Sequence, residues 1–293
     1  MNKNSTYQDG WFTEDAAPVG SRFSLSVHKK LHEEQTPFQF LEIYQTTHYG
    51  NLMVLDGYIM LSQRDNFIYH EMLSHPVLFS HIAPKKVAII GGGDCGTLRE
   101  VLKHDCVEHV WQIDIDERVT RNAERYFPEL CRSNNDPRAE LLFLDGIKWM
   151  AQAESDSLDI IIVDSTDPVG PGAGLFREPF YRDCCRALTD GGLIVQQSES
   201  PLADARQITY PMREIMASVD FQDVQTLFFP AVLYPTGWWS ATVAVKNSRI
   251  HFARRQDAES KPFATDYYNA RIHEAAFAVP EFFAQGRMIE PIK

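Results

Sequence analysis

From Arg22 to Ser62, apolar and polar positions alternate as they do in strands with one buried face. Leu25 and Val27 alternate with serines, and residues 52–61 form two apolar runs around Asp56-Gly57. Asp-Gly favours the type I′ turn of a hairpin, because both residues of that turn adopt positive φ. The pattern predicts a small N-terminal β domain, which we place at residues 1–65.

A helix-like segment follows, and after it apolar runs alternate with polar, helix-like stretches. Asn66–His81 carries apolar residues at helical spacing, although Pro76 inside it is a residue that kinks or divides helices. From about Lys85 to Lys246 the alternation is typical of βαβ units and a parallel sheet. The sequence therefore predicts an α/β fold, with a Rossmann-like, mostly parallel sheet in residues 66–293.

Acidic residues follow four of the predicted strands. The strands are Lys86–Gly91, His109–Gln112, Glu140–Leu144 and Leu158–Val163, and the acids are Asp94, Asp114, Asp145 and Asp164. Ligands of an open parallel sheet bind outside the carboxyl ends of its strands. This sheet would therefore present a rim of carboxylates, which disfavours a phosphate-rich ligand and favours a cation.

The overall charge agrees with a cationic small substrate. The formal net charge is −12 and the pI is about 5.3, which argues against nucleic acid and anionic membrane as partners. No apolar run approaches transmembrane length. Five cysteines without a Cys-x-x-Cys pair suggest neither a zinc site nor a disulfide framework. We therefore expect reduced thiols, a cytoplasmic location and no metal.

A glycine-rich turn follows the first strand of the predicted parallel sheet. Residues 91–96 match G-x-G-x-x-G, with Gly91 and Gly93 as its first two glycines, and Asp114 lies about twenty residues further on. In this context the glycines allow close backbone approach to a nucleotide, and the acid can hydrogen-bond ribose hydroxyls. The alternative is a glycine turn that only packs a helix onto the sheet.

Asp94 inside this turn helps to distinguish the nucleotides that such a fold can bind. Two like charges ~5 Å apart repel by roughly 3 kcal/mol at an effective dielectric constant of ~20, so Asp94 disfavours a pyrophosphate. It favours a nucleoside that carries a positive centre, such as a sulfonium. Asp145-Gly146, after the third strand, would suit an adenine amino group, although this dipeptide also makes plain turns.

A pair of acids follows the fourth strand. Residues 164–171 read Asp-Ser-Thr-Asp-Pro-Val-Gly-Pro. Asp164 and Asp167 can converge on one amine if the segment turns, and the two prolines would stiffen that turn. The alternative is an Asx turn in which Asp167 is solvated.

Two histidines on the predicted helix raise the question of a metal site. His70 and His75 lie five residues apart, whereas histidines that bind zinc from one helical face lie four apart. We therefore expect His70 to hydrogen-bond near the site and His75 to be structural.

Together these motifs resemble the polyamine aminopropyltransferases, most closely the spermidine synthases, along nearly the whole chain. The matching stretches are Gly10–Phe12, Tyr49–Leu52, Leu55–Gly57, Tyr69–Met72, Gly91–His104, Asp164–Pro171, Gln197–Ser200, Tyr234–Gly237, Tyr267–Asn269 and Ile272-His273. Their combination in this order is highly specific.

The resemblance implies an N-terminal β domain before a Rossmann-like domain, in homodimers or homotetramers. It also implies transfer of an aminopropyl group from decarboxylated S-adenosylmethionine to a diamine. With putrescine as the diamine, the products are spermidine and methylthioadenosine. Decarboxylated S-adenosylmethionine would be a co-substrate, with no permanently bound cofactor.

On the acceptor side, the resemblance implies that Asp164 accepts the proton of the attacking amine and that Tyr69 orients this amine. The residues expected to hold the diamine or to line its channel are Asp167, Gln197, Tyr234, His70 and Trp11. For Trp11 the contact would be cation–π, and the alternative is a structural role in the β domain.

On the nucleoside side, Asp114 matches the family's ribose acid, where Glu is usual. Asp145 matches its adenine acid, and Asp94 matches the acid that receives the aminopropyl ammonium. The other residues expected to contact the nucleoside are Gly91, Gly93 and Gly146.

Besides Asp114, the chain departs from the family pattern at Met60, Asn66 and Cys95, and Trp238-Trp239 makes an unusually bulky channel edge. Met60 stands where Gln is usual, Asn66 where Glu is usual, and Cys95 where Gly is usual. If position 95 requires positive φ, Cys95 strains the turn.

Other activities remain open on the sequence. They are the same chemistry on cadaverine or agmatine, a methyltransferase that uses intact S-adenosylmethionine, and a non-enzymatic homologue that binds polyamine or nucleoside. The acidic rim disfavours the methyltransferase, because the carboxylate of intact S-adenosylmethionine would enter a negative field.

Overall fold

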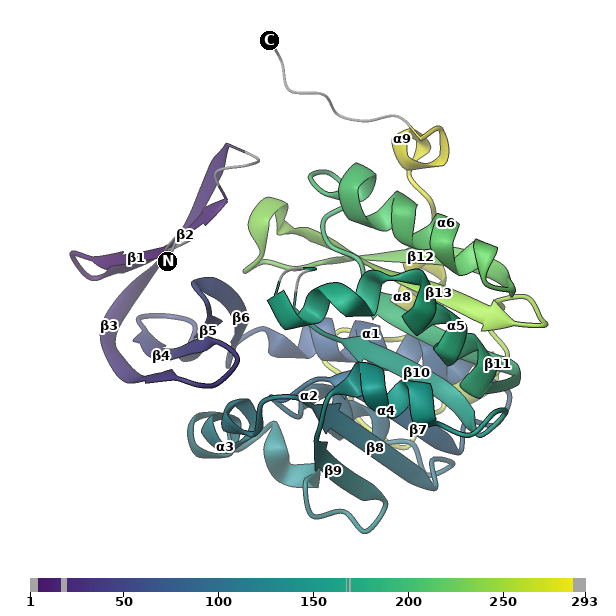
Figure 1. Cartoon of the computed structure of the whole chain (residues 1–293). Helices are drawn as coiled ribbons and strands as arrows, with labels where there is room; N and C mark the ends of the chain where they lie inside the picture. The colour runs from purple at the N-terminus through teal and green to yellow at the C-terminus, as the bar shows by residue number, and fades with distance from the viewer. Residues whose placement is uncertain (1–4, 17–19, 167, 169, 287–293) are drawn as a thin grey trace.

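The structure is a computed structural model that describes residues 5–16, 20–166, 168 and 170–286. Within these ranges the strands form two separate sheets, one near the N-terminus and one in the rest of the chain (Figure 1). The predicted fold class is confirmed: a small N-terminal β domain precedes a Rossmann-like, mostly parallel sheet. The exact division of the chain at residue 65 stays a prediction.

The N-terminal sheet is antiparallel, with its strands in chain order. The strands are β1 (Ser5–Gln8), β2 (Trp11–Ala16), β3 (Ser21–Gln35), β4 (Phe40–Thr46), β5 (Asn51–Leu55) and β6 (Tyr58–Ser62). The predicted hairpin joins β5 to β6, and Asp56 and Gly57 there have φ of 50° and 88°. The sequence pattern does not predict β1 and β2, because their largely polar side chains alternate weakly and their pairing rests on backbone hydrogen bonds.

The second sheet has the strand order β12-β13-β11-β10-β7-β8-β9. Its strands are β7 (Lys86–Gly91), β8 (His109–Asp114), β9 (Ala139–Phe143), β10 (Leu158–Asp164), β11 (Leu188–Gln197), β12 (Phe221–Pro230) and β13 (Trp238–Lys246). The five strands from β11 to β9 are parallel, whereas β13 is antiparallel to both β11 and β12. The carboxyl ends of β10, β7, β8 and β9 therefore meet at one edge.

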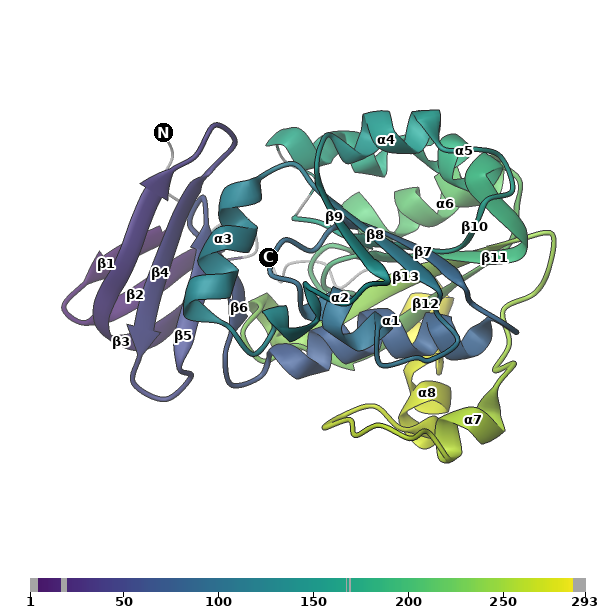
Figure 2. The same cartoon turned by 90° about the horizontal axis from the view of Figure 1, so that it is seen from below.

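Helices cover both faces of this second sheet (Figure 2). On one face lie α1 (Asn66–Ser80), α2 (Gly96–Val101) and α8 (Ala270–Ala276), and on the other lie α4 (Gly146–Gln152), α5 (Glu178–Ala187) and α6 (Tyr210–Ser218). Two short helices near the C-terminus are α7 (Arg255–Glu259) and α9 (Glu281–Ala284). None of the helices in the described ranges combines the length and the apolar character that crossing a membrane requires.

The remaining helix, α3 (Glu117–Tyr126), follows β8 of the large sheet and packs against the small sheet. Val119, Ala123 and Phe127, which belong to this helix or directly follow it, share a hydrophobic cluster with Leu41 and Ile43 of β4. Because of this packing, the small sheet lies beside the carboxyl end of β8, from which α3 starts.

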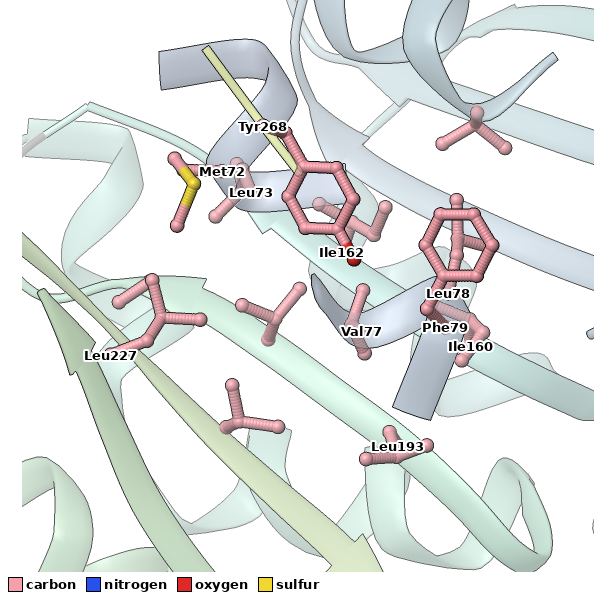
Figure 3. Close-up of a cluster of buried hydrophobic side chains, with 14 of the residues drawn as sticks. Met72, Leu73, Val77, Leu78, Phe79, Ile160, Ile162, Leu193, Leu227 and Tyr268 are labelled. Carbon is pink, nitrogen blue, oxygen red and sulfur yellow. The ribbon is translucent and has the colours of Figure 1, made fainter. Parts of the chain in front are cut away.

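α1 is buried along most of its length and forms the centre of one core (Figure 3). The cluster combines helix residues, strand residues and one tyrosine from the C-terminal segment; among them are Met72, Leu73, Val77, Leu78, Phe79, Ile160, Ile162, Leu193, Leu227 and Tyr268. The helix continues through Pro76, so it is not divided there. Its burial on all sides explains this, because packing supplies more stability than one lost backbone hydrogen bond removes.

Leu78→Ala should lower the free energy of unfolding by about 2–5 kcal/mol, because Leu78 is fully buried and its removal leaves a cavity. Urea denaturation followed by circular dichroism measures this change. Leu202→Ala is the matched control, since that leucine is 36% exposed, and we expect a change of about 0.5 kcal/mol or less. Equal losses in the two variants would contradict the placement of this core.

Candidate active site

A cavity lies between the carboxyl ends of the parallel strands and the edge of the small sheet. The large sheet contributes residues 91–93 and all four acids that the sequence places at strand ends, Asp94, Asp114, Asp145 and Asp164. The small sheet contributes mainly apolar side chains, which are Met53, Leu55, Met60 and Leu61. Residues 230–234, from the end of β12 onward, form a further part of the wall. The predicted rim of carboxylates is therefore present, and it faces an apolar wall.

The glycine-rich turn allows the end of β7 to approach β10 and α1 closely. A Cβ atom on Gly91, whose φ is 87°, would lie 2.1 Å from the backbone oxygen of Asp164. A Cβ atom on Gly96 would lie 2.2 Å from the His70 ring. Only glycine fits at these two positions, so the turn is held directly against the two neighbouring site residues.

Cys95 occupies a left-handed position in the same turn. Its φ is 68°, so the position does require positive φ, and a side chain there is strained where the family has Gly. The thiol is buried and accepts a hydrogen bond from the Gln112 side chain at 3.4 Å. On either side of it, Gly91 and Gly96 make close contacts that no other residue would allow.

Asp94 forms an ion pair with His70, which comes from α1. Nε2 of His70 lies 3.2 Å from Oδ1 and 3.3 Å from Oδ2 of Asp94. Burial lowers the pKa of the His70 imidazole, but the charge and hydrogen bond of Asp94 outweigh it and the pKa is raised overall. Burial raises the pKa of Asp94, but His70 and the Gly96 amide outweigh it and the pKa is lowered overall. Both directions favour an imidazolium beside a carboxylate.

Asp164, at the end of β10, is held by two hydroxyl groups. Its Oδ1 accepts a hydrogen bond from the Tyr69 hydroxyl at 2.9 Å, and its Oδ2 accepts one from the Thr97 hydroxyl at 2.6 Å. Burial and the nearby charge of Asp94 raise the pKa of Asp164, although His70 and the two hydrogen bonds act against the rise. A carboxylate with a raised pKa is a stronger proton acceptor near neutral pH.

Asp114 is the third acid of the rim, at the end of β8. Its Oδ1 accepts the backbone N–H of Asp116 at 2.8 Å. Burial, together with the charge of Asp116, raises the pKa of Asp114 to about 6. A Cβ atom on Gly93 would lie 2.7 Å from Oδ2 of Asp114, so the glycine turn and this acid are in close contact.

Asp145 forms the N-cap of α4. Its Oδ1 accepts the backbone N–H groups of Ile147 and Lys148 at 3.0 and 3.3 Å, and its side chain still lines the cavity. A Cβ atom on Gly146 would lie 2.6 Å from the Ile90 side chain. The dipeptide therefore starts a helix and limits the cavity at the same time.

The other predicted site residues differ in where they lie. Tyr234 lines the cavity, and its hydroxyl donates a hydrogen bond to the backbone oxygen of Met60 at 2.6 Å. Gln197 is buried, and its amide donates to the Glu199 carboxylate at 2.9 Å. Trp11 is 51% exposed on β2. Neither Gln197 nor Trp11 is among the described residues that line the cavity, and Asp167 lies outside the described residues.

The sequence reasoning missed several cavity residues. Asp65 lines the cavity just before α1, and its carboxylate accepts the Ser62 hydroxyl at 2.6 Å. It directly precedes the helix that carries Tyr69, and this position was a usable signal for an acid at the same end of the helix. Phe38 and Gln39, from the β3–β4 loop, also line the cavity, and no motif in the sequence marks them.

The described residues contain no group of three histidine, cysteine or acidic side chains arranged to hold a metal ion. His75, the second histidine of α1, bonds instead to His104 at 2.9 Å and to Glu100 at 3.1 Å. All three side chains are buried. His75 therefore has the structural environment that the sequence predicts.

Asp114→Asn should change how stability depends on pH. Between the ordinary pKa of 3.8 and the raised pKa of about 6, the folded protein keeps a proton that the unfolded chain releases, so wild-type stability falls as pH rises through this window. The shift corresponds to at most about 3 kcal/mol, and partial solvent exposure reduces this to about 1–2 kcal/mol.

Urea denaturation at pH 4, 5, 6 and 7 measures this dependence. We expect the Asn variant to lose the decline and to be more stable than the wild type at pH 7. Asp105→Asn, at an exposed aspartate, is the control and should follow the wild-type curve. Parallel curves for the wild type and Asp114→Asn would show that Asp114 does not titrate in this window.

Comparisons with known proteins agree with this geometry. The model of the spermidine synthase tetramerisation domain matches residues 10–63, and that of the spermine/spermidine synthase domain matches residues 66–254. A polyamine aminopropyltransferase of Thioalkalivibrio sulfidiphilus is 61% identical over 273 residues, which cover 93% of this chain and 96% of the relative. One of Methylococcus capsulatus is 62% identical over 273 residues, covering 93% and 95% of the two chains.

Solved structures show the same similarity. A spermidine synthase in complex with the transition-state analogue AdoDATO superposes with a TM-score of 0.90 at 32% identity, covering 97% of both chains. The spermidine synthase of Thermotoga maritima superposes with a TM-score of 0.88 at 32% identity, covering 97% of this chain and 96% of the other. This chain is therefore an enzyme of the polyamine aminopropyltransferases and belongs to their spermidine synthase family.

Proposed function

We propose that the enzyme transfers the aminopropyl group of decarboxylated S-adenosylmethionine to putrescine, which gives spermidine and methylthioadenosine. The observation that carries this proposal is that one cavity holds two acids whose pKa values are shifted in opposite directions. Asp94 is held as a carboxylate by His70, whereas Asp164 has a raised pKa and contacts two hydroxyl groups. The first suits a fixed cation, and the second suits an amine that must lose a proton.

At the nucleoside end, we propose that Asp114 hydrogen-bonds the ribose hydroxyls and that Asp145 accepts from the adenine amino group. Gly91, Gly93 and Gly146 give the nucleoside close access to the backbone. Asp114 and Asp145 lie at the ends of β8 and β9, next to each other in the sheet, which suits two parts of one nucleoside.

Asp94 would receive the aminopropyl ammonium of the co-substrate. Intact S-adenosylmethionine carries a carboxylate on the same carbon, and that carboxylate would enter the field of Asp94 and Asp164. Two like charges ~5 Å apart repel by roughly 3 kcal/mol at an effective dielectric constant of ~20. The rim therefore discriminates by repulsion, which favours the decarboxylated co-substrate and disfavours a methyltransferase.

At the acceptor end, the amine must be neutral when it attacks. An alkyl ammonium with a pKa near 10 is neutral in only about one molecule per thousand at pH 7, so a positioned proton acceptor contributes to the rate. We propose that Asp164 accepts the proton while Tyr69 orients the nitrogen. The nitrogen lone pair forms the new C–N bond as the C–S bond breaks, and the bonding electrons remain on sulfur as a neutral thioether.

Further residues are proposed to hold the diamine. Tyr234, whose ring lies 6.1 Å from that of Tyr69, lines the diamine channel, and His70 keeps Asp94 charged beside it. Contacts of the diamine with Asp167, Gln197 and Trp11 remain proposals from the family resemblance. For Gln197, such a contact requires that the amide exchange its bond to Glu199 for one to the ligand.

The proposal includes assembly and location. We propose a homodimer or homotetramer that uses the N-terminal sheet, because the family domain matched by residues 10–63 is described as a tetramerisation domain. We also propose a cytoplasmic location, since all five cysteines are free and four of them are buried, as expected in a reducing compartment. Residues 1–65 and 66–293 are the proposed domains.

The experiment that tests the activity is an endpoint assay with decarboxylated S-adenosylmethionine and four acceptors in parallel: putrescine, cadaverine, agmatine and spermidine. Methylthioadenosine and the amine product are quantified by mass spectrometry. We expect spermidine from putrescine as the main product, and no transfer from intact S-adenosylmethionine. A different preferred amine would overturn the choice of putrescine, and bound nucleoside without any turnover would indicate a non-enzymatic binding protein.

Asp164→Asn should lower kcat by about 10²–10⁴-fold, because the amine loses its proton acceptor. The affinity for methylthioadenosine, measured by calorimetry, should change little. Because the pKa of Asp164 is raised, wild-type activity should fall on acidification at a pH above the ordinary aspartate range, as the proton acceptor becomes protonated.

Asp159→Asn is the matched control for this variant. Asp159 lies on the same strand at the opposite end, where its carboxylate accepts the amides of Lys85 and Lys86, so kcat should stay within about twofold of the wild type. An Asp164→Asn enzyme with wild-type kcat would rule out Asp164 as the proton acceptor.

A further inference from the structure

A buried carboxylate joins the two sheets beside the cavity. Asp116 lies two residues after Asp114 and is 1% exposed. Its Oδ1 accepts the backbone N–H of Arg118 at 3.0 Å and so forms the N-cap of α3. This N-cap uses one oxygen of the carboxylate and leaves the other to contact a different part of the chain.

The second oxygen of Asp116 bonds to the loop between β3 and β4, about eighty residues earlier in the chain. Oδ2 accepts the Thr36 hydroxyl at 2.7 Å and the Gln39 side-chain amide at 3.0 Å. The Thr36 oxygen in turn accepts the backbone N–H groups of Phe38 and Gln39 at 3.1 and 3.0 Å. The loop is thus a closed turn, and Asp116 holds both of its ends.

This loop forms part of the cavity wall. Phe38 and Gln39 line the cavity together with Asp114, and the backbone N–H of Asp116 donates to Oδ1 of Asp114 at 2.8 Å. A continuous series of hydrogen bonds therefore runs from the acid at the end of β8, through Asp116, to the loop of the small sheet. The bond to Gln39 holds the nitrogen of its side-chain amide against Asp116 and so restricts the orientations open to the amide oxygen.

A second connection between the same elements lies outside the cavity and serves as a comparison. Arg118 and Glu34 form a bidentate ion pair, with distances of 2.6 and 3.1 Å. The Arg118 side chain is 49% exposed, and neither residue lines the cavity. Exposed ion pairs contribute little to the stability of the fold, whereas hydrogen bonds to a buried carboxylate are strong and directional.

We infer that Asp116 is a positioning residue for the reaction: it holds Phe38 and Gln39 as the wall over the nucleoside end of the cavity and orients the Gln39 amide. The inference rests on the proposed function, because it takes the co-substrate nucleoside as the occupant of the cavity beside Asp114. Asp116 acts on the nucleoside through Gln39 and the loop, while Asp164 and Tyr69 act at the other end.

Asp116→Asn tests this role. Asn keeps the size of the side chain and can keep the N-cap, but its NH₂ group would face the Thr36 hydroxyl and the Gln39 amide, which are donors. We expect the KM for decarboxylated S-adenosylmethionine to rise about tenfold, and the Kd of methylthioadenosine, measured by calorimetry, to rise by a similar factor. The kcat and the KM for putrescine should stay within about twofold.

Arg118→Gln is the matched control, because it breaks the outer connection between the same elements and leaves the Asp116 contacts in place. Its KM for the co-substrate should stay within about twofold of the wild type.

Gln39→Ala tests whether the effect of Asp116 reaches the nucleoside through Gln39. Since Asp116 acts largely through Gln39, the double variant should be weakened by less than the product of the two single effects.

Three outcomes would overturn the inference: an unchanged nucleoside Kd in folded Asp116→Asn, a rise in both KM values together with a fall in kcat, or an equal effect of Arg118→Gln. If Asp116→Asn does not fold, Thr36→Val removes the Thr36 hydroxyl, and with it the bond to Asp116 and the bonds that it accepts from two loop amides. The same Kd should then rise by about threefold, and an unchanged Kd would overturn the inference. Failure of the proposed function is distinguishable, because the wild type itself would then neither bind methylthioadenosine nor transfer aminopropyl groups.

Discussion

Repulsion between carboxylates at one edge of the sheet is the interaction on which the site depends. Burial and, after it, the charge of Asp94 raise the pKa of Asp164, and any two like charges ~5 Å apart repel by roughly 3 kcal/mol at an effective dielectric constant of ~20. The positive charge of His70 offsets the negative charge of Asp94, whereas Asp164 is held by the neutral hydroxyl groups of Tyr69 and Thr97. The binding of a cation relieves this cost. The acidic rim therefore favours cationic ligands before any specific hydrogen bond is considered.

The scaffold keeps these acids close together despite their repulsion. Gly91 lets the end of β7 contact β10, and α1 carries Tyr69 and His70 against the glycine turn. Glu71, the next residue of α1, is buried and accepts the backbone N–H groups of residues 266–268 at 2.8, 2.9 and 2.7 Å. The C-terminal segment is thus hydrogen-bonded to the helix that supplies the two site residues. This helix therefore packs against the large sheet on one side and against the C-terminal segment on the other.

The small sheet contributes the apolar half of the cavity and part of its wall. Where the family usually has Gln, Met60 presents a thioether to the cavity, and the Tyr234 hydroxyl bonds to the backbone oxygen of Met60. That contact uses the backbone of residue 60, so it does not depend on the side chain there. Cys95 is tolerated in a similar way, because the strain at one residue is small compared with the packing of the turn around it.

Much of this protein follows from the sequence alone. The period of apolar residues determines the two kinds of sheet, Asp-Gly determines the β5–β6 turn, and the acids at strand ends form the rim because parallel strands end at one edge. Only the tertiary structure decides which side chains share a proton or a charge. The pairing of His70 with Asp94, the two hydroxyls on Asp164, and the link from Asp116 to Thr36 and Gln39 join residues that are 24 to 95 positions apart. No local pattern records such contacts, because they arise from the way helices and loops pack across the sheet edge.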